Sequence, residues 1–175
     1  MINKWNFQTP SEEELHKRDQ LVAELGFSPV ICLLLVQRGI TSIEEAKKFF
    51  KPSLNDLHDP LLMPDMDKAV RRLNKALGNK EKILIYGDYD VDGTTAVSLV
   101  FKYLRPYSST LDFYIPDRYD EGYGISYKGI DYAAENGVSL VISLDCGIKA
   151  IEKIEYAKEK GIDFIICDHH MPDAT

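Results

Sequence analysis

Apolar residues follow two different spacings along this chain, and the change comes near residue 80. Before it, they recur every three or four residues between capping signals, as in amphipathic helices. Ser11 with Glu14 forms a capping box, and Ser28 with Pro29 begins a second helix. We expect four helices, at about 11–26, 28–39, 41–51 and 65–77.

From Glu81 onward, short apolar runs alternate with helical segments. Strands are expected at 83–86, 111–115, 139–144 and 163–167, and helices at 94–104, 127–136 and 149–160. The runs are continuous, which is typical of strands buried on both faces of a parallel sheet. The order predicts an α/β fold, a doubly wound parallel β-sheet preceded by a helical N-terminal arm. We assign residues 1–80 to the arm and residues 81–175 to the sheet domain.

Charged and imidazole side chains follow each predicted strand. They are Asp88, Asp90 and Asp92 after the first, Arg118 after the second, Asp145 at the end of the third, and Asp168-His169-His170 after the fourth. Because the carboxyl ends of parallel strands meet at one edge, we expect these groups to lie together. Carboxylates at alternate positions repel one another unless a cation lies among them. Imidazoles suit manganese, iron or zinc better than calcium, so the pattern favours a metal-dependent hydrolase.

The acidic segment 88–93 is also compatible with other sites. An EF-hand loop would need a glutamate at its twelfth position, where this chain has Leu99, and a preceding helix, where a strand is expected. A phosphatase of the haloacid-dehalogenase type would use Asp90 as nucleophile and Asp92 as acid/base. Its motif directly follows its strand, however, and it gives the later histidines no role. A solvated acidic turn would leave the placement of Asp145 and His169 unexplained.

Composition narrows the class of protein but not its substrate. With 45% hydrophobic residues the chain can form a core, and no apolar run approaches the ~20 residues of a membrane span. Residues 1–5 begin no apolar signal sequence, so we expect a cytoplasmic protein with no membrane partner. The three cysteines have no regular spacing and argue against a disulfide framework. Residues 81–175 carry 17 acidic and 9 basic side chains, which neither excludes nor supports a nucleic-acid substrate.

Six ordered motifs carry a resemblance to a known family. They are residues 56–70, 85–95, Ile115-Pro116-Asp117-Arg118, Glu121-Gly122-Tyr123-Gly124, Ser143-Leu144-Asp145-Cys146-Gly147 and Cys167-Asp168-His169-His170. The chain resembles the DHH phosphoesterase superfamily and, within it, the 5′→3′ exonucleases specific for single-stranded DNA. The resemblance spans most of the chain, including the helical front part.

The resemblance implies a role for each candidate residue. Asp90 and Asp92 would each hold one of two divalent ions, Mn²⁺ or Mg²⁺. Asp145 would bridge the ions, His169 would ligate the second, and Asp88 would be a further ligand. Asp168 would orient a histidine, and His170 would contact the scissile phosphate. Arg118 is a candidate phosphate clamp and Tyr123 a candidate base-stacking residue.

The family pattern also sets expectations beyond these residues. Many members carry a histidine where this chain has Tyr86. Because a tyrosine replaces this histidine, Asp88 becomes a more important candidate ligand. We expect the strand order 2-1-3-4, with further family elements beyond Thr175, so turnover by this segment alone is left open. Expected partners are single-stranded DNA and repair proteins such as a helicase and a single-strand-binding protein. Alternatives are a relative acting on oligoribonucleotides, cyclic dinucleotides or pyrophosphate, and a non-catalytic scaffold.

Overall fold

The chain forms two compact units, Met1–Leu62 and Met63–Thr175, in a computed structural model that describes residues 9–173. Residues 1–5, considered above as a possible signal sequence, lie outside the described residues. No helix in the range 9–173 combines the length and apolar character needed to cross a membrane. Each unit has its own hydrophobic core.

The first unit is helical, as predicted. It contains α1 (Glu12–Leu25), α2 (Pro29–Gln37) and α3 (Ile43–Phe50), followed by two short 3₁₀ helices, η1 (Leu54–Asp56) and η2 (Pro60–Leu62), which periodicity did not predict. Ser11 and Ser42 each cap a helix through a reciprocal capping box. The core of this unit is formed by Leu21, Cys32, Leu35, Val36 and Ala46.

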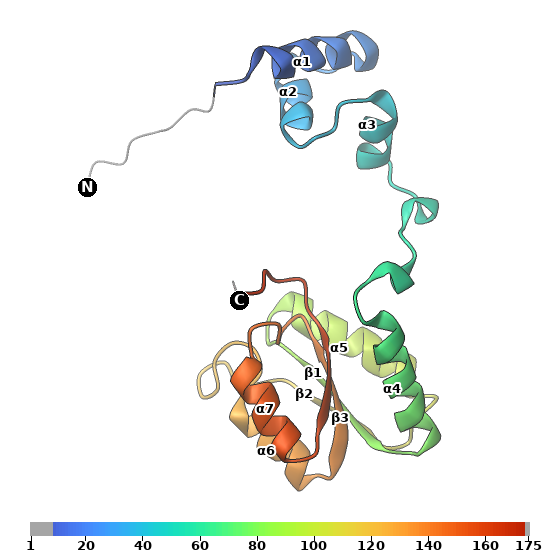
Figure 1. Cartoon of the computed structure of the whole chain (residues 1–175), viewed down its shortest axis with the longest axis vertical. Coiled ribbons are helices and arrows are strands. Elements are labelled where there is room, and N and C mark those ends of the chain that lie inside the picture. The colour runs from blue at the N-terminus through green and yellow to red at the C-terminus, as the bar shows by residue number, and fades with distance from the viewer. Residues whose placement is uncertain (1–8, 174–175) are drawn as a thin grey trace, which may run out of the picture. The chain divides into compact units, whose positions relative to one another are not determined.

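The second unit is a doubly wound sheet of four parallel strands in the order β2-β1-β3-β4, which confirms the predicted order (Figure 1). The strands are β1 (Lys82–Gly87), β2 (Leu111–Tyr114), β3 (Val138–Leu144) and β4 (Asp163–Cys167). The helices are α4 (Met66–Gly78), α5 (Val91–Leu104), α6 (Tyr127–Glu135) and α7 (Ile151–Glu159).

Two separate cores cover the two faces of this sheet. On one face, Leu84 and Val141 pack with residues of α6 and α7. On the other face, Ile83 and Ile142 pack with residues of α4 and α5, and Figure 1 shows these helix pairs on opposite sides of the strands. Burial on both faces explains why the strand sequences are continuously apolar.

Helix α4 packs on the sheet, whereas we assigned it to the N-terminal arm. Leu73, Ala76 and Leu77 join the core under β1 and β3. Arg72 also ties α4 to the sheet, through Glu81 at 2.7 Å and Asp163 at 2.5 Å. The compact units therefore divide after Leu62, ahead of the predicted boundary at residue 80.

The junction of β1 and α5 is close-packed and depends on two glycines. A Cβ atom on Gly93 would lie 2.5 Å from the Asp88 carbonyl oxygen, and one on Gly87 would lie 2.3 Å from Val97 Cγ2. Helix α5 begins at Val91, earlier than the predicted residue 94, because Asp90 accepts a hydrogen bond from the Gly93 N–H and caps it. The acidic segment is therefore held between a strand end and a helix start.

Candidate metal centre

Asp145, His169 and His170 form a group of potential metal ligands at the carboxyl edge of the sheet. One ligand atom from each lies within 4.8 Å of the others. His169 Nε2 is 3.0 Å from Asp145 Oδ1, and the centres of the two imidazole rings are 4.6 Å apart. The Asp145 side chain is 8% exposed and that of His169 is 75% exposed, so the group has a buried base and an open side.

The backbone conformation of Asp145 orients its carboxylate. Asp145 has φ +62°, a left-handed conformation that non-glycine residues seldom adopt. Its N–H donates to the Cys167 carbonyl at 2.8 Å, which fixes the end of β3 against the end of β4. Strained conformations of this kind concentrate at functional sites, where the surrounding structure stabilises them.

Asp168 supports His170 from a buried position. Its Oδ1 lies 2.7 Å from His170 Nδ1 and accepts the His170 N–H at 3.0 Å, while its Oδ2 accepts the Ile148 N–H at 2.9 Å. Burial opposes the charge of Asp168, but these hydrogen bonds outweigh it and hold its pKa below the usual value. The hydrogen bond to Asp168 raises the pKa of His170. With Nδ1 facing Asp168, the Nε2 atom of His170 is left to face another group.

The three carboxylates after β1 have different surroundings. Asp88 is fully buried, and its oxygens accept the N–H groups of Tyr89 at 2.7 Å and Gly124 at 2.8 Å. Burial raises the pKa of Asp88, with the charges of Asp90 and Asp145 adding to the effect. Asp90 is half-buried, and Asp92 is exposed in the first turn of α5. The structure therefore brings Asp145, His169 and His170 together, and it leaves the ligand roles of these three aspartates as predictions.

The loop between β2 and α6, residues 115–126, passes over the ends of these strands. Glu121 folds it: its carboxylate accepts hydrogen bonds from the Tyr114 hydroxyl at 3.0 Å, the Asp117 N–H at 2.8 Å and the Ser126 hydroxyl. Burial opposes its charge, but these hydrogen bonds hold the pKa of Glu121 below the usual value. The Tyr86 hydroxyl donates to the Gly124 carbonyl at 3.0 Å.

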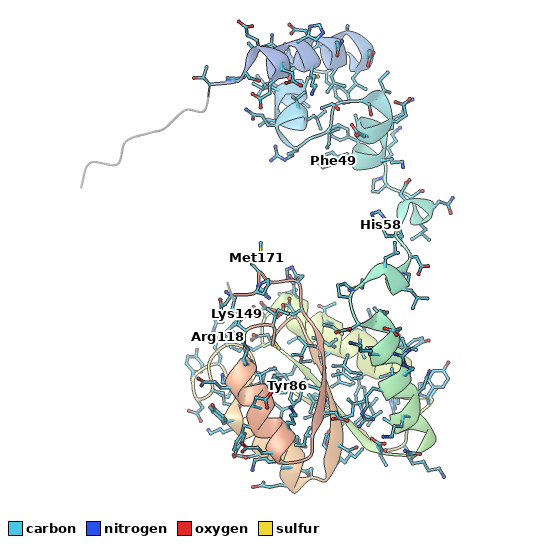
Figure 2. All side chains as sticks on the ribbon, in the orientation of Figure 1. Phe49, His58, Tyr86, Arg118, Lys149 and Met171 are labelled. Carbon is cyan, nitrogen blue, oxygen red and sulfur yellow. The ribbon has the colours of Figure 1, made fainter. Side chains whose placement is uncertain are left out.

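This loop carries both predicted DNA-binding residues. The Tyr123 hydroxyl is 3.4 Å from Asp90 Oδ2, and its ring meets that of Tyr89 edge-on at 5.7 Å. Partial burial and the neighbouring carboxylates raise the pKa of Tyr123 to about 12, so its hydroxyl stays neutral. The Arg118 guanidinium lies 5.1 Å from the centre of the Tyr89 ring, and Figure 2 shows Arg118 at the same end of the unit as Lys149 and Met171. Arg118 therefore contacts Tyr89, and Tyr89 contacts the ring of Tyr123, whose hydroxyl reaches Asp90.

The donor set fits a divalent metal ion of intermediate softness. One carboxylate and two imidazoles within a few ångströms are ligands that Mn²⁺, Fe²⁺ and Zn²⁺ accept in proteins. The charges of Asp90 and Asp145 add to the burial that raises the pKa of Asp88, as expected for carboxylates that lie close together. The arrangement can therefore hold a cation.

Sequence reasoning missed Tyr86 and Glu121 as determinants of the site. The sequence marks Tyr86 only as a replacement for a histidine common in the family. Its ring is buried, stacks on Tyr114 at 5.5 Å, and its hydroxyl accepts the Ser126 N–H at 3.0 Å. The signal available in the sequence was the motif Glu121-Gly122-Tyr123-Gly124, in which the acid had no role assigned to it.

Comparison with known proteins gives matches over the whole sheet unit. The profile of the DHH family, N-terminal domain, matches residues 82–175. The chain is 40% identical to the single-stranded-DNA-specific exonuclease RecJ of Bacillus subtilis over 97% of its own length and 21% of that protein. It is 32% identical to RecJ of Escherichia coli, over 93% of this chain and 27% of that protein. The chain thus spans about a fifth to a quarter of these relatives.

Two solved structures of proteins named RecJ share the fold. The crystal structure of RecJ in complex with Mn²⁺ from Thermus thermophilus superposes with a TM-score of 0.64 at 25% identity, covering 92% of this chain and 22% of the other. A crystal structure of exonuclease RecJ bound to manganese gives a TM-score of 0.61 at 29% identity, covering 68% and 31%. Both similar proteins were crystallised with the kind of ion that the donor set accepts.

Proposed function

This chain belongs to the DHH family, and from that premise we propose that it forms the metal-binding part of an exonuclease acting on single-stranded DNA. The reaction is hydrolysis of phosphodiester bonds from the 5′ end, releasing 5′-mononucleotides. The observation that carries the proposal is the pairing of Asp145 and His169 as potential ligands, 3.0 Å apart at the carboxyl edge, with His170 within 4.8 Å of both. A family relative that served only as a scaffold would have no need of this donor set.

The carboxylates and His169 hold two divalent ions, Mn²⁺ or Mg²⁺, in this proposal. Asp90 and Asp92 each bind one ion, Asp145 binds both, and Asp88 adds a further ligand. The 3.0 Å approach of His169 Nε2 to Asp145 Oδ1 supports a shared ligand position. Divalent ions offset negative charge that develops on phosphate oxygens and ease the deprotonation of water.

His170 contacts the scissile phosphate, and Asp168 positions it. Because Nδ1 of His170 faces the Asp168 carboxylate at 2.7 Å, Nε2 can donate to a phosphate oxygen when the ring is protonated. The Asp168 carboxylate beside Nδ1 stabilises that protonated form. Asp168 acts through the histidine and through the Ile148 N–H, which it binds at the same time.

The 115–126 loop supplies the contacts to the rest of the DNA strand. Arg118 binds a backbone phosphate through its planar guanidinium, held at its present place by the Tyr89 ring. Tyr123 stacks on a base, which suits a sequence-independent substrate because every base offers a flat face. We assign the protein to DNA repair and recombination in the cytoplasm, with a helicase and a single-strand-binding protein as partners.

The test is release of mononucleotides from single-stranded DNA labelled at the 5′ or the 3′ end, in the presence of Mn²⁺. We compare the chain with its Asp145→Ala variant, and with Asp120→Ala, which removes an exposed acid of the neighbouring loop. The same variants are then assayed in B. subtilis RecJ with its corresponding segment replaced by this chain. Early release of the 5′ label that is abolished by Asp145→Ala alone is the expected result.

Two outcomes count against the proposal. Release that starts at the 3′ end would assign the opposite polarity. A chimeric RecJ that folds, binds Mn²⁺ and still releases no label would show that the metal site formed by this chain does not support hydrolysis, and would favour the non-catalytic scaffold.

A further inference from the structure

A cavity of about 550 Å³ is lined in part by His170, and neither Asp145 nor His169 belongs to its lining. It shares Asp168 and His170 with the candidate metal centre. Its other walls come from the 123–125 part of the loop and from residues 146–150 and Lys153. The volume lies within the ~300–1,000 Å³ typical of small-molecule sites. A group bonded to a phosphate at the metal centre could therefore continue past His170 into this cavity.

The cavity has an apolar floor and mouth. Ile125 and Cys146 are buried at its base, and Ile148 and Met171 are exposed at its edge. Cys146 is a free cysteine and only 3% exposed, so its side chain adds to the apolar surface of the cavity. Ala150 leaves space between α7 and the loop because its side chain is a single methyl group.

Two lysines bring positive charge to the cavity. The Lys153 ammonium donates to the Ile125 carbonyl at 2.5 Å and lies 5.8 Å from the Tyr127 ring, so it is fixed beside the cavity. Lys149 also lines the cavity, is exposed and pairs with Asp173 at 3.0 Å, and Figure 2 shows it at the same end of the unit as Met171. Positive charge here is notable in a half of the chain with 17 acidic and 9 basic residues. Because both lysines are engaged by acceptors of the protein itself, the apolar side chains are the surface that the cavity offers to a ligand.

The polar side chains that line the cavity are already engaged with the protein. Asp168 binds His170, Lys153 binds the Ile125 carbonyl, and the Tyr123 hydroxyl lies 3.4 Å from Asp90. Groups so engaged are poorly placed to distinguish the edges of different bases. Contact with apolar side chains and with the Tyr123 ring is tolerant of base identity.

We propose that this cavity binds the nucleoside bonded to the phosphate at the metal centre, without selecting among bases. The inference rests on the proposed function and deepens it: it assigns the wall formed by Ile125, Ile148 and Met171 to the sugar and base of the substrate. The metal centre and His170 then hold the phosphate, and the cavity holds the group attached to it.

The test uses methyl NMR of the full chain with Mg²⁺ as a diamagnetic ion. The probes are thymidine 5′-monophosphate, deoxyribose 5-phosphate and inorganic phosphate. We expect thymidine monophosphate to shift the methyl signals of Ile125, Ile148 and Met171, and to bind at least about tenfold more tightly than deoxyribose 5-phosphate. The methyl groups of Ile83 and Ile85, buried on the other face of the sheet, serve as internal references.

Filling the cavity provides the matched comparison. Ile148→Trp should weaken binding of thymidine monophosphate by about tenfold while leaving inorganic phosphate unaffected. Ile151→Trp, at an exposed position of α7 outside the cavity lining, should change the affinity for neither thymidine monophosphate nor inorganic phosphate. The inference fails if thymidine monophosphate shifts the cavity methyl groups no more than phosphate does, or if Ile148→Trp leaves its affinity unchanged.

Failure of the proposed function would look different. In one case, Asp145→Ala abolishes phosphate binding, and in the unchanged protein the nucleotide shifts only the signals of residues at the metal centre. The proposed function then stands and the cavity inference is overturned. If the nucleotide shifts the cavity methyl groups equally in Asp145→Ala and in the unchanged protein, the cavity inference stands without a metal-dependent function.

Discussion

Tyr86 and Asp88, two residues apart at the end of β1, both bind the backbone of Gly124. The Tyr86 hydroxyl donates to the Gly124 carbonyl at 3.0 Å, and Asp88 Oδ2 accepts the Gly124 N–H at 2.8 Å. Gly124 has φ +83°, a conformation that favours glycine, and it follows Tyr123 directly. The strand that leads into the acidic segment therefore also fixes the position of Tyr123 beside Asp90.

Replacing Tyr86 with phenylalanine should destabilise the sheet unit. The change removes one hydroxyl and leaves the Gly124 carbonyl and the Ser126 N–H without this partner in a buried place. Leaving such groups unpaired costs about 1–3 kcal/mol. We expect Tyr86→Phe to lower the free energy of unfolding by this amount in a urea titration.

The control is Tyr103→Phe, which removes a hydroxyl from a largely exposed ring on α5. The free energy of unfolding of this variant should stay within about 0.5 kcal/mol of that of the unchanged protein. Equal effects of the two substitutions would mean that the Tyr86 hydroxyl does not hold the loop.

Gly93 should not tolerate even a methyl group. A Cβ atom there would lie 2.5 Å from the carbonyl oxygen and 2.6 Å from the nitrogen of Asp88, and neither backbone atom can rotate away. We expect Gly93→Ala to lower the free energy of unfolding by at least about 2 kcal/mol, measured by urea denaturation. Gly78→Ala, at a helical position with no atom within 4 Å of the added carbon, should be neutral or stabilise by up to about 1 kcal/mol.

The fold could be predicted largely because its local signals agree with its topology. Continuous apolar runs such as 83–86 and 139–144 indicated strands covered on both faces, and the cores on the two faces of the sheet bear this out. The stripe of Met66, Val70, Leu73 and Leu77 predicted α4 as an amphipathic helix but could not say what the helix packs on. A hydrophobic stripe specifies that a face is buried, not which partner covers it.

The site could be predicted only where residues end a strand. Asp145 and His169 follow neighbouring strands, so the parallel topology alone brings them to one edge. Glu121 and Tyr86 act through hydrogen bonds to the 115–126 loop, whose path no periodicity determines. Asp88 is a further case, since its partner Gly124 lies 36 residues later in the same loop.

The contact between Arg72 and Glu81 should make stability depend on pH in the acid range. Both side chains are largely buried and lie 2.7 Å apart. Burial opposes the charge of Glu81, but hydrogen bonds from Arg72, Ser139 and Asn79 outweigh it and hold the pKa below its usual value. A carboxylate with a lowered pKa in the folded state stabilises above its ordinary pKa, and this contribution is lost as the pH falls through the folded value.

We therefore expect Arg72→Met to lower the free energy of unfolding by about 3 kcal/mol at neutral pH, because the substitution leaves the Glu81 charge without its partner. The cost should shrink as the pH is lowered through the folded-state pKa of Glu81 and that carboxylate takes up a proton. Urea titrations across this range measure it. Arg71→Met is the matched control, since Arg71 forms an exposed pair with Asp67 and should cost less than about 1 kcal/mol. A cost for Arg72→Met that does not change with pH would exclude Glu81 as its origin.

Binding of Mn²⁺ should stabilise the sheet unit through Asp145. An ion that binds the folded state alone adds about 2.7 kcal/mol when its concentration is a hundred times its dissociation constant. The Asp145 carboxylate is nearly buried, whereas His169 is exposed, so little water can solvate this carboxylate when the ion is absent. We therefore expect loss of Asp145 to weaken Mn²⁺ binding more than loss of any other ligand. We expect Mn²⁺ to raise the melting temperature of the unchanged protein, chelation to reverse the rise, and Asp145→Ala to abolish it. Asp120→Ala, which removes an exposed acid that pairs with Lys128, should retain the full rise. A rise that survives Asp145→Ala would place the ion elsewhere among the acidic side chains of this half of the chain.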